Sequence, residues 1–370
     1  MTVETAAETR IDPARMRHLA NAIRALSMDA VEAANSGHPG MPMGMADVAT
    51  VLWTRHLKFD AADPAWPDRD RFILSAGHGS MLIYSLLHLT GSEDVTLDEI
   101  RNFRQLGSKT PGHPEYGHTA GVEMTTGPLG QGISTAVGFA LAERMTNARF
   151  GDDLVDHHTY VIASDGDLQE GISHEAISLA GHLKLNRLVV LWDDNEISID
   201  GDTRLSESMD VLKRFEAANW QVCRVDGHDP EAIDAALVNA RSSDKPVLIA
   251  CRTTIGYGAP TKAGKASSHG APLGADEIKA TREALKWAHG DFELPDDVVA
   301  EWNAAGRRAV AERAAWQDRL AASGRQAEFI ASLAPDMPET TAKVMAQYRK
   351  ELAAERPSIA SRASSGQTLD

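Results

Sequence analysis

Two short stretches of the sequence carry oxygen-bearing side chains at a spacing that suits a metal site. Asp165 follows the apolar run 159–164, and Asn195 closely follows the apolar run 188–192. A stretch of helical character separates the runs, so we expect parallel strands that present both side chains at one carboxyl edge of a sheet, where open α/β folds bind ligands. Carboxylate, amide and carbonyl oxygens suit a hard cation such as Mg²⁺, which takes phosphate oxygens as further ligands. The pattern therefore predicts a metal-bridged diphosphate.

A simpler interpretation of the same residues stays open, because Asp and Asn also favour turns after strands. The metal site is favoured by the two matched strand ends and by Gly166, which follows the aspartate. Gly166 has no Cβ, so a diphosphate can approach the backbone closely. Ile197 can contribute only its backbone carbonyl oxygen, and this contribution requires a bent chain.

Four histidines lie in loops rich in Gly and Pro: His38, His78, His113 and His269. For His38 the alternative is an exposed imidazole at a helix C-cap. A zinc site is disfavoured because no pair of the four has the short helical spacing of zinc ligands. Proton transfer and hydrogen bonding to hydroxyl or phosphate groups are the better use of these imidazoles.

A glycine-rich segment, Gly127-Pro128-Leu129-Gly130-Gln131-Gly132, precedes an apolar helix expected at 133–141. Its glycines allow backbone N–H groups and a helix N-terminus to approach a flat or anionic ligand. The segment matches neither the dinucleotide-binding fingerprint nor the P-loop, so those two classes of nucleotide site lose their usual support.

The rest of the sequence predicts the elements that position these residues. Strand and helix patterns alternate from 159 to 252, which argues for an α/β fold with a doubly wound, mostly parallel sheet and helices on both faces. Strands are expected at 71–75, 159–164, 188–192, 221–225 and 246–252. Helices are expected from Asp12-Pro13 to a stop at Gly37, and at 43–57, 81–89 and 276–290. Long loops are expected at 104–132 and 253–274, a disordered lead at 1–10 and an unstructured end at 364–370.

Composition limits the classes of function. The formal net charge is −16, which argues against nucleic acid or an anionic membrane as the main partner. The chain has no signal-like start, no apolar run long enough to span a membrane, and two cysteines that we expect to be reduced and buried. These features predict a cytoplasmic location.

Five motifs occur in order along the chain: Ser36-Gly37-His38-Pro39-Gly40, Pro111-Gly112-His113-Pro114-Glu115, Thr125-Thr126-Gly127-Pro128-Leu129-Gly130-Gln131-Gly132, Asp165-Gly166 through Glu170-Gly171-Ile172-Ser173-His174-Glu175, and His269-Gly270-Ala271-Pro272-Leu273-Gly274. Together they resemble the motifs of transketolases, and the resemblance is collinear from about residue 14 to the end. One segment departs from the usual thiamine diphosphate signature, because Ser164 stands in place of its first glycine, but both metal ligands remain.

The resemblance implies a thiamine-diphosphate-binding fold and a role for each candidate residue. The metal ligands would be Asp165, Asn195 and the carbonyl of Ile197, holding Mg²⁺ or, in its place, Ca²⁺, Mn²⁺ or Co²⁺. The thiamine diphosphate contacts would be His78, Gly127, Pro128, Leu129, Gly166, Asn195 and His269. The catalytic residues would be His38, His113 and His269, of which His38 and His269 would also touch the sugar.

The resemblance also implies a domain organisation. Residues 1–290 would be the diphosphate-binding domain, 291–356 a helical linker, and 357–370 the truncated start of a pyrimidine-binding domain. In the family, the domains that follow supply the glutamate that activates the cofactor and the arginines that grip the substrate phosphate. We therefore expect this polypeptide alone to bind cofactor weakly and to turn over little or no sugar.

The implied reaction transfers a two-carbon ketol unit from a ketose phosphate (sedoheptulose 7-phosphate, xylulose 5-phosphate or fructose 6-phosphate) to an aldose phosphate. It would serve the pentose phosphate pathway or the Calvin cycle, in a homodimer. The alternatives are a deoxyxylulose-phosphate synthase, a 2-oxo-acid dehydrogenase subunit and a non-catalytic binding protein. An NAD-dependent dehydrogenase fits least, since no glycine fingerprint follows a strand.

Overall fold

The computed structural model describes residues 11–334 and 338–369. The lead expected at 1–10 lies outside the described residues. The chain divides into two compact units, Met1–Arg319 and Leu320–Asp370. All of the predicted site residues belong to the first unit. The domain boundaries expected from the family resemblance stay a prediction.

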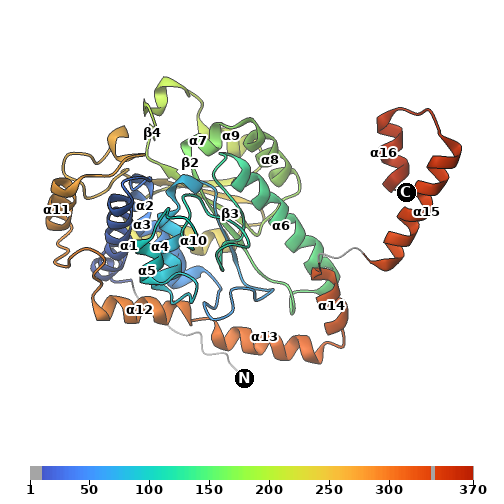
Figure 1. The fold of residues 1–370 in the computed structure, drawn as a ribbon, viewed down its shortest axis with the longest axis horizontal. Helices are drawn as coiled ribbons and strands as arrows, with labels where there is room; N and C mark the ends of the chain where they lie inside the picture. The colour runs from blue at the N-terminus through green and yellow to red at the C-terminus, as the bar shows by residue number, and fades with distance from the viewer. Residues whose placement is uncertain (1–10, 335–337, 370) are drawn as a thin grey trace. The chain divides into compact units, whose positions relative to one another are not determined.

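A five-stranded parallel sheet forms the middle layer of the first unit (Figure 1). The order across the sheet is β1-β2-β3-β7-β6, so the chain starts at one edge, passes through β2 to β3, forms the far edge with β6 and returns inward with β7. A separate antiparallel pair joins β4 (Ile197–Ser198) to β5 (Gly201–Asp202). The strands of the main sheet are β1 (Arg71–Leu74), β2 (Thr159–Ser164), β3 (Leu188–Asp194), β6 (Gln221–Asp226) and β7 (Val247–Arg252).

Helices cover both faces of this sheet because the side chains of its central strands are apolar on both faces. In β2, Tyr160 and Ile162 enter one buried apolar cluster, whereas Val161 and Ala163 enter the other. The first cluster is completed by α1 (Pro13–Ala34), α3 (Ala46–Val51), α4 (Met81–Leu89) and α10 (Pro230–Arg241). The second is completed by α6 (Gln131–Phe150), α8 (Gly171–His182) and α9 (Val211–Ala217). The doubly wound α/β prediction is confirmed.

Helix α1 begins as the sequence predicts but ends earlier. The Asp12 side chain accepts hydrogen bonds from the backbone N–H groups of Ala14 and Arg15, with Pro13 at the first helical position. The predicted stop at Gly37 is wrong, because Asn35 already adopts the left-handed conformation (φ 47°) and caps the helix. Asn tolerates this conformation better than other non-glycine residues do.

Other predicted boundaries also need correction. The helix expected at 43–57 is three short pieces, α2 (Gly40–Gly44), α3 and a π-helical turn η1 (Leu52–His56). Strand β3 runs two residues further than expected, through the acidic pair that ends at Asp194, because pairing with β7 continues there. Helix α11 (Ala275–Ala284) stops before 290.

The expectation of an unstructured end at 364–370 is wrong for the described residues, because α16 (Ser361–Leu369) is helical. Its polar sequence offers no apolar periodicity from which to predict a helix. In the parts of the chain that the structure describes, no helix combines the length and apolar composition needed to cross a lipid bilayer. The remaining helices are α5 (Leu97–Arg101), α7 (Asp165–Gln169), α12 (Asp296–Gly306), α13 (Val310–Ala322), α14 (Gln326–Leu333) and α15 (Glu339–Glu355).

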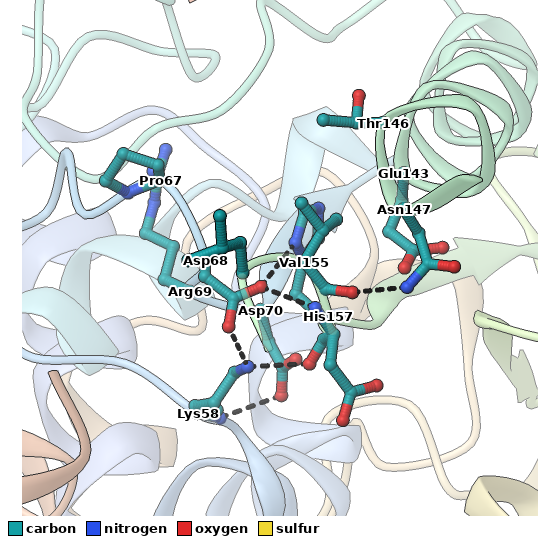
Figure 2. Close-up of polar contacts among 12 residues, drawn as sticks. Lys58, Pro67, Asp68, Arg69, Asp70, Glu143, Thr146, Asn147, Val155 and His157 are labelled. Atoms are coloured by element: carbon teal, nitrogen blue, oxygen red, sulfur yellow. Dashed lines mark hydrogen bonds and ion pairs between the residues drawn. The ribbon is translucent and has the colours of Figure 1, made fainter. Parts of the chain in front are cut away.

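A buried polar cluster lies at the amino ends of β1 and β2, at the edge of the sheet opposite to the one where the strands end (Figure 2). Asp68 accepts hydrogen bonds from Lys58 Nζ (2.8 Å) and from the backbone N–H of Asp156 (2.7 Å). Asp70 accepts from the backbone N–H groups of Lys58 (2.8 Å) and His158 (2.7 Å). The segments that lead into the two strands are therefore tied together before the strands begin.

Two helical glycines give a matched test of the packing. A Cβ on Gly181 of α8 would lie 1.6 Å from the carbonyl oxygen of Ala218, whereas one on Gly138 of α6 would meet no atom within 4 Å. We expect Gly181→Ala to lower the free energy of unfolding by at least about 1–3 kcal/mol, as overpacking does. We expect Gly138→Ala to raise it by up to about 1 kcal/mol, since alanine favours helices. Urea unfolding of both variants measures the difference, and equal midpoints would contradict this packing.

Candidate cofactor and metal site

The two predicted metal-binding side chains do lie at one edge of the sheet. Ser164, the last residue of β2, pairs in register with Asp193 of β3. Asp165 opens α7 directly after β2, and Asn195 directly follows β3. The chain bends at Glu196, whose φ is +60°, so the bent backbone expected next to Ile197 is present.

Asp165 is a buried carboxylate with one unsatisfied oxygen. Its Oδ1 accepts a hydrogen bond from Trp192 Nε1 (3.0 Å), whereas Oδ2 is buried and has no hydrogen-bond partner. Burial, with the nearby Asp193 adding to it, raises the pKa of Asp165 to about 8. A buried carboxylate is costly unless a cation or donors compensate its charge. The orphaned oxygen therefore fits a bound cation.

Asn195 is held by its own neighbours. Its Nδ2 donates to Asp193 Oδ2 (2.8 Å), and its Oδ1 accepts from the backbone N–H of Ile197 (2.9 Å). An amide oxygen has two lone pairs, so this Oδ1 can still accept one further ligand. Within the described residues, no three His, Cys, Asp or Glu side chains form a metal cluster. One carboxylate, one amide and one carbonyl oxygen suit a hard cation that keeps water or phosphate ligands.

A cavity of about 270 Å³ opens at this edge of the sheet. The predicted residues that line it are His78, Gly127, Leu129, Gly166, Asn195, Ile197 and His269. Four predicted residues are not among its lining: His38, His113, Pro128, and Asp165, which lines a separate cavity of about 530 Å³. The lining residues that we did not predict are Met41, Ser164, Asp193, Ser198, Ile199 and Ile255.

Three of the four predicted histidines form a cluster. The ring centroids are 5.1 Å apart for His38 and His78, 5.6 Å for His38 and His269, and 5.1 Å for His78 and His269. The Nδ1 atoms of His38 and His269 are buried without a hydrogen-bond partner. Burial, reinforced by the other imidazoles, lowers the pKa of His38 to about 4 and that of His78 to about 3. These rings are therefore neutral at pH 7, and two of them have an unused nitrogen.

The fourth histidine, His113, lies against the glycine-rich segment. A Cβ on Gly127 would come within 3.1 Å of the His113 ring, and Gly127 also has a φ of +143° that favours glycine. Burial and the positive charge of Arg104 lower the pKa of His113. Arg104 also lowers the pKa of His38, although burial and the charge of His269 have larger effects on it. Sequence reasoning missed Arg104, whose left-handed backbone (φ +64°) no local pattern indicates.

Sequence reasoning also missed Asp167, which ties three segments together. Asp167 Oδ1 accepts from Ser75 Oγ (3.0 Å) and from the backbone N–H of Gly130 (2.9 Å). Its Oδ2 accepts from the backbone N–H of Ser164 (2.9 Å), and the two residues form a capping box at the start of α7. The sequence contains a signal for this capping box, because the serine at 164 is followed three residues later by the aspartate at 167. Asp167 therefore fixes the glycine-rich segment to the ends of β1 and β2.

The parallel sheet, the carboxyl-edge cavity and its oxygen donors define the class of this protein as an α/β domain that binds an anionic cofactor at strand ends. A sequence profile described as "Transketolase, thiamine diphosphate binding domain" matches residues 15–340. The chain belongs to this family.

Individual relatives agree with this assignment. The chain is 59% identical over 359 residues to a transketolase of Cereibacter sphaeroides, covering 97% of this chain and 54% of the relative. A crystal structure of transketolase from Campylobacter jejuni is 45% identical, with a TM-score of 0.85 over 89% of this chain and 51% of that one. A Pichia stipitis transketolase complex with sedoheptulose 7-phosphate is 42% identical, with a TM-score of 0.81 over 85% and 47% of the two chains. The chain thus spans about half the length of the relatives it matches.

The partly buried imidazole of His78 makes stability depend on pH. In the unfolded chain His78 binds a proton below about pH 6.5, whereas burial keeps the folded-state pKa near 3. The unfolded state therefore holds more protons in this window, and the free energy of unfolding falls as the pH falls. In His78→Asn we expect a smaller fall between about pH 6.5 and 5, measured by urea unfolding at several pH values. The control is His182→Asn, on an exposed position of α8, and an unchanged slope in His78→Asn would contradict the burial argument.

Proposed function

We propose that this chain is the cofactor-binding part of a transketolase, which transfers a two-carbon ketol unit from a ketose phosphate to an aldose phosphate. One observation carries the proposal: neutral imidazoles with unused buried nitrogens cluster beside a cavity whose sheet edge holds an orphaned carboxylate oxygen. Such a site can bind a cation that holds a diphosphate, and it places groups that hydrogen-bond hydroxyls close to that cation. The names of the relatives support the same reaction.

The cofactor would be thiamine diphosphate with Mg²⁺, or with Ca²⁺, Mn²⁺ or Co²⁺ in its place. When bound, thiamine diphosphate supplies the carbon nucleophile that carries the two-carbon unit. Asp165, Asn195 and the carbonyl of Ile197 would hold the cation. Gly127 and Gly166 leave room for the diphosphate, and Leu129 covers the adjoining surface of the cavity.

The histidines would handle the hydroxyl groups and protons of the sugar. A neutral imidazole offers one donor and one acceptor, so it can bind a hydroxyl and move its proton. His38 and His269 have free Nδ1 atoms for this purpose, and His78 is stacked on His269 at an interplanar angle of 18°. His113, whose ring lies against Gly127, would stabilise a developing oxyanion.

The whole enzyme would be a cytoplasmic homodimer of the pentose phosphate pathway or the Calvin cycle. Exposed apolar side chains on α6 and α8 support a subunit interface: Met145 is 65% exposed, Ile172 47% and Leu179 47%. The free thiols of Cys223 and Cys251 fit a reducing compartment. Light scattering of the complete protein would measure its oligomeric state.

Complementation tests the reaction. The 370-residue chain would be mixed with the separately produced remaining half of a related transketolase, Mg²⁺ and thiamine diphosphate. We expect ketol transfer from xylulose 5-phosphate to an aldose phosphate in the mixture and little or none with either part alone. Decarboxylation of a 2-oxo acid without ketol transfer would instead favour one of the rival thiamine diphosphate enzymes.

Asp165→Asn separates metal binding from folding. The amide keeps an oxygen for Trp192 Nε1 but offers the cation no negative charge. We expect the Mg²⁺-dependent affinity for thiamine diphosphate to fall at least about 100-fold, since even indirect disturbance of a metal site costs 10–100-fold. The metal-free protein should be at least as stable as the parent near pH 7, because folding raises the pKa of Asp165 and so costs free energy, and the amide removes this cost.

Calorimetric titration with thiamine diphosphate and Mg²⁺, together with urea unfolding, measures both effects. Asp244→Asn, on an exposed turn, is the matched control and should leave both unchanged. Parent-like affinity in Asp165→Asn would remove this residue from the metal site.

A further inference from the structure

The cavity depends on a loop, residues 253–274, that follows β7 and brings Ile255 and His269 to the cavity wall. The loop contains little regular structure beyond the short 3-10 turn Ala266–Ser268. It lies closely against α2: a Cβ on Gly40 would meet the carbonyl oxygen of Ser268 at 2.4 Å. Its position must therefore be set by specific contacts rather than by a sheet or a long helix.

One such contact reaches the loop from outside the cavity. The backbone N–H of Thr254 donates to Nε2 of His228 (3.0 Å). His228 lies in the turn between β6 and α10, and its Nδ1 is 2.9 Å from Asp47 Oδ2. Its ring also stacks on Tyr257 of the loop, with centroids 4.0 Å apart. A single imidazole thus contacts the loop at two residues.

The carboxylate that contacts His228 belongs to a buried ion pair. Asp47 is 2% exposed and pairs with Arg24, which has no exposed surface. Although burial opposes ionisation, Arg24 and the hydrogen bond from His228 lower the pKa of Asp47. Arg24 also donates to the carbonyl of Met43 (3.0 Å), and its guanidinium lies 4.5 Å from the centre of the Tyr257 ring.

These contacts fix the tautomer of His228. A backbone N–H can only donate, so Nε2 must carry a lone pair; an ionised carboxylate can only accept, so Nδ1 must carry the hydrogen. The neutral Nδ1–H form satisfies both partners at once. Any form with a hydrogen on Nε2 loses the bond to Thr254.

We propose that His228 is a positioning residue for the cofactor cavity: in its neutral Nδ1–H form it ties the loop that bears Ile255 and His269 to the buried Arg24–Asp47 pair. The inference rests on the proposed function only in naming the ligand of the cavity as thiamine diphosphate. His228 itself does not line the cavity, so it acts through the loop.

Two substitutions of His228 each keep one of its two hydrogen bonds and remove the other. Asparagine places an N–H where Nδ1 was, so His228→Asn keeps the donor to Asp47 and loses the acceptor for Thr254. Glutamine reaches the position of Nε2, so the Oε1 of His228→Gln can accept from Thr254 while the donor to Asp47 is lost. His182→Asn, on the exposed side of α8, is the control.

The first measurement is amide hydrogen exchange of the 370-residue chain without cofactor. We expect exchange in residues 253–269 to speed up about tenfold in His228→Asn, the effect of losing one net hydrogen bond. We expect a smaller increase there in His228→Gln, which keeps the bond to Thr254 but loses the one to Asp47, and parental exchange in His182→Asn, with β3 unchanged in all variants. Unchanged loop exchange in His228→Asn, or equal effects of Asn and Gln, would overturn the proposal.

The second measurement is the ¹⁵N NMR spectrum of the parent's histidine rings, which requires no variant to fold. A protonated Nδ1 and an unprotonated Nε2 for His228 are expected, and the reverse pattern would overturn the proposal. Titration with thiamine diphosphate and Mg²⁺ should then show an affinity about tenfold lower in His228→Asn and partly restored in His228→Gln. If the parent itself does not bind thiamine diphosphate, the proposed function fails, whereas exchange and NMR still judge the role of His228.

Discussion

The structure depends on one costly arrangement, a buried carboxylate with an oxygen that no donor satisfies. Asp165 occupies this position because β2 ends one residue earlier, in register with Asp193 of β3. The register brings Asn195 and the bend at Glu196 to the same edge. The apolar clusters on the two faces of the sheet hold the strands in place, so the packing stabilises an electrostatic arrangement that is unfavourable until a cation binds.

The surroundings of this edge keep the remaining groups neutral and fixed. Burial holds the imidazoles of His38 and His78 without charge near pH 7, so they offer hydrogen bonds rather than positive charge. Asp167 fixes the glycine-rich segment from one side, and His228 fixes the loop of His269 from the other. The cation would thus supply positive charge at the sheet edge, and the protein holds the groups around it in place.

Much of this could be predicted from the sequence, because the strands of the sheet are short apolar runs with helical patterns between them. The same regularity predicted that Asp165 and Asn195 share an edge. The cluster of His38, His78 and His269 required knowledge of three loops that approach from distant parts of the chain, and there the family resemblance supplied what local patterns could not. Arg104 and His228 were missed since their roles arise only from tertiary contacts. The ends of helices were predicted poorly where one residue, such as Asn35, stops a helix before the expected glycine.

The most direct test is a crystal structure of the chain grown with thiamine diphosphate and Ca²⁺. The account predicts a cation bound by Asp165 Oδ2, the Asn195 side chain and the Ile197 carbonyl, in contact with the diphosphate. A cation and diphosphate bound elsewhere, with that oxygen of Asp165 still unpaired, would contradict the account.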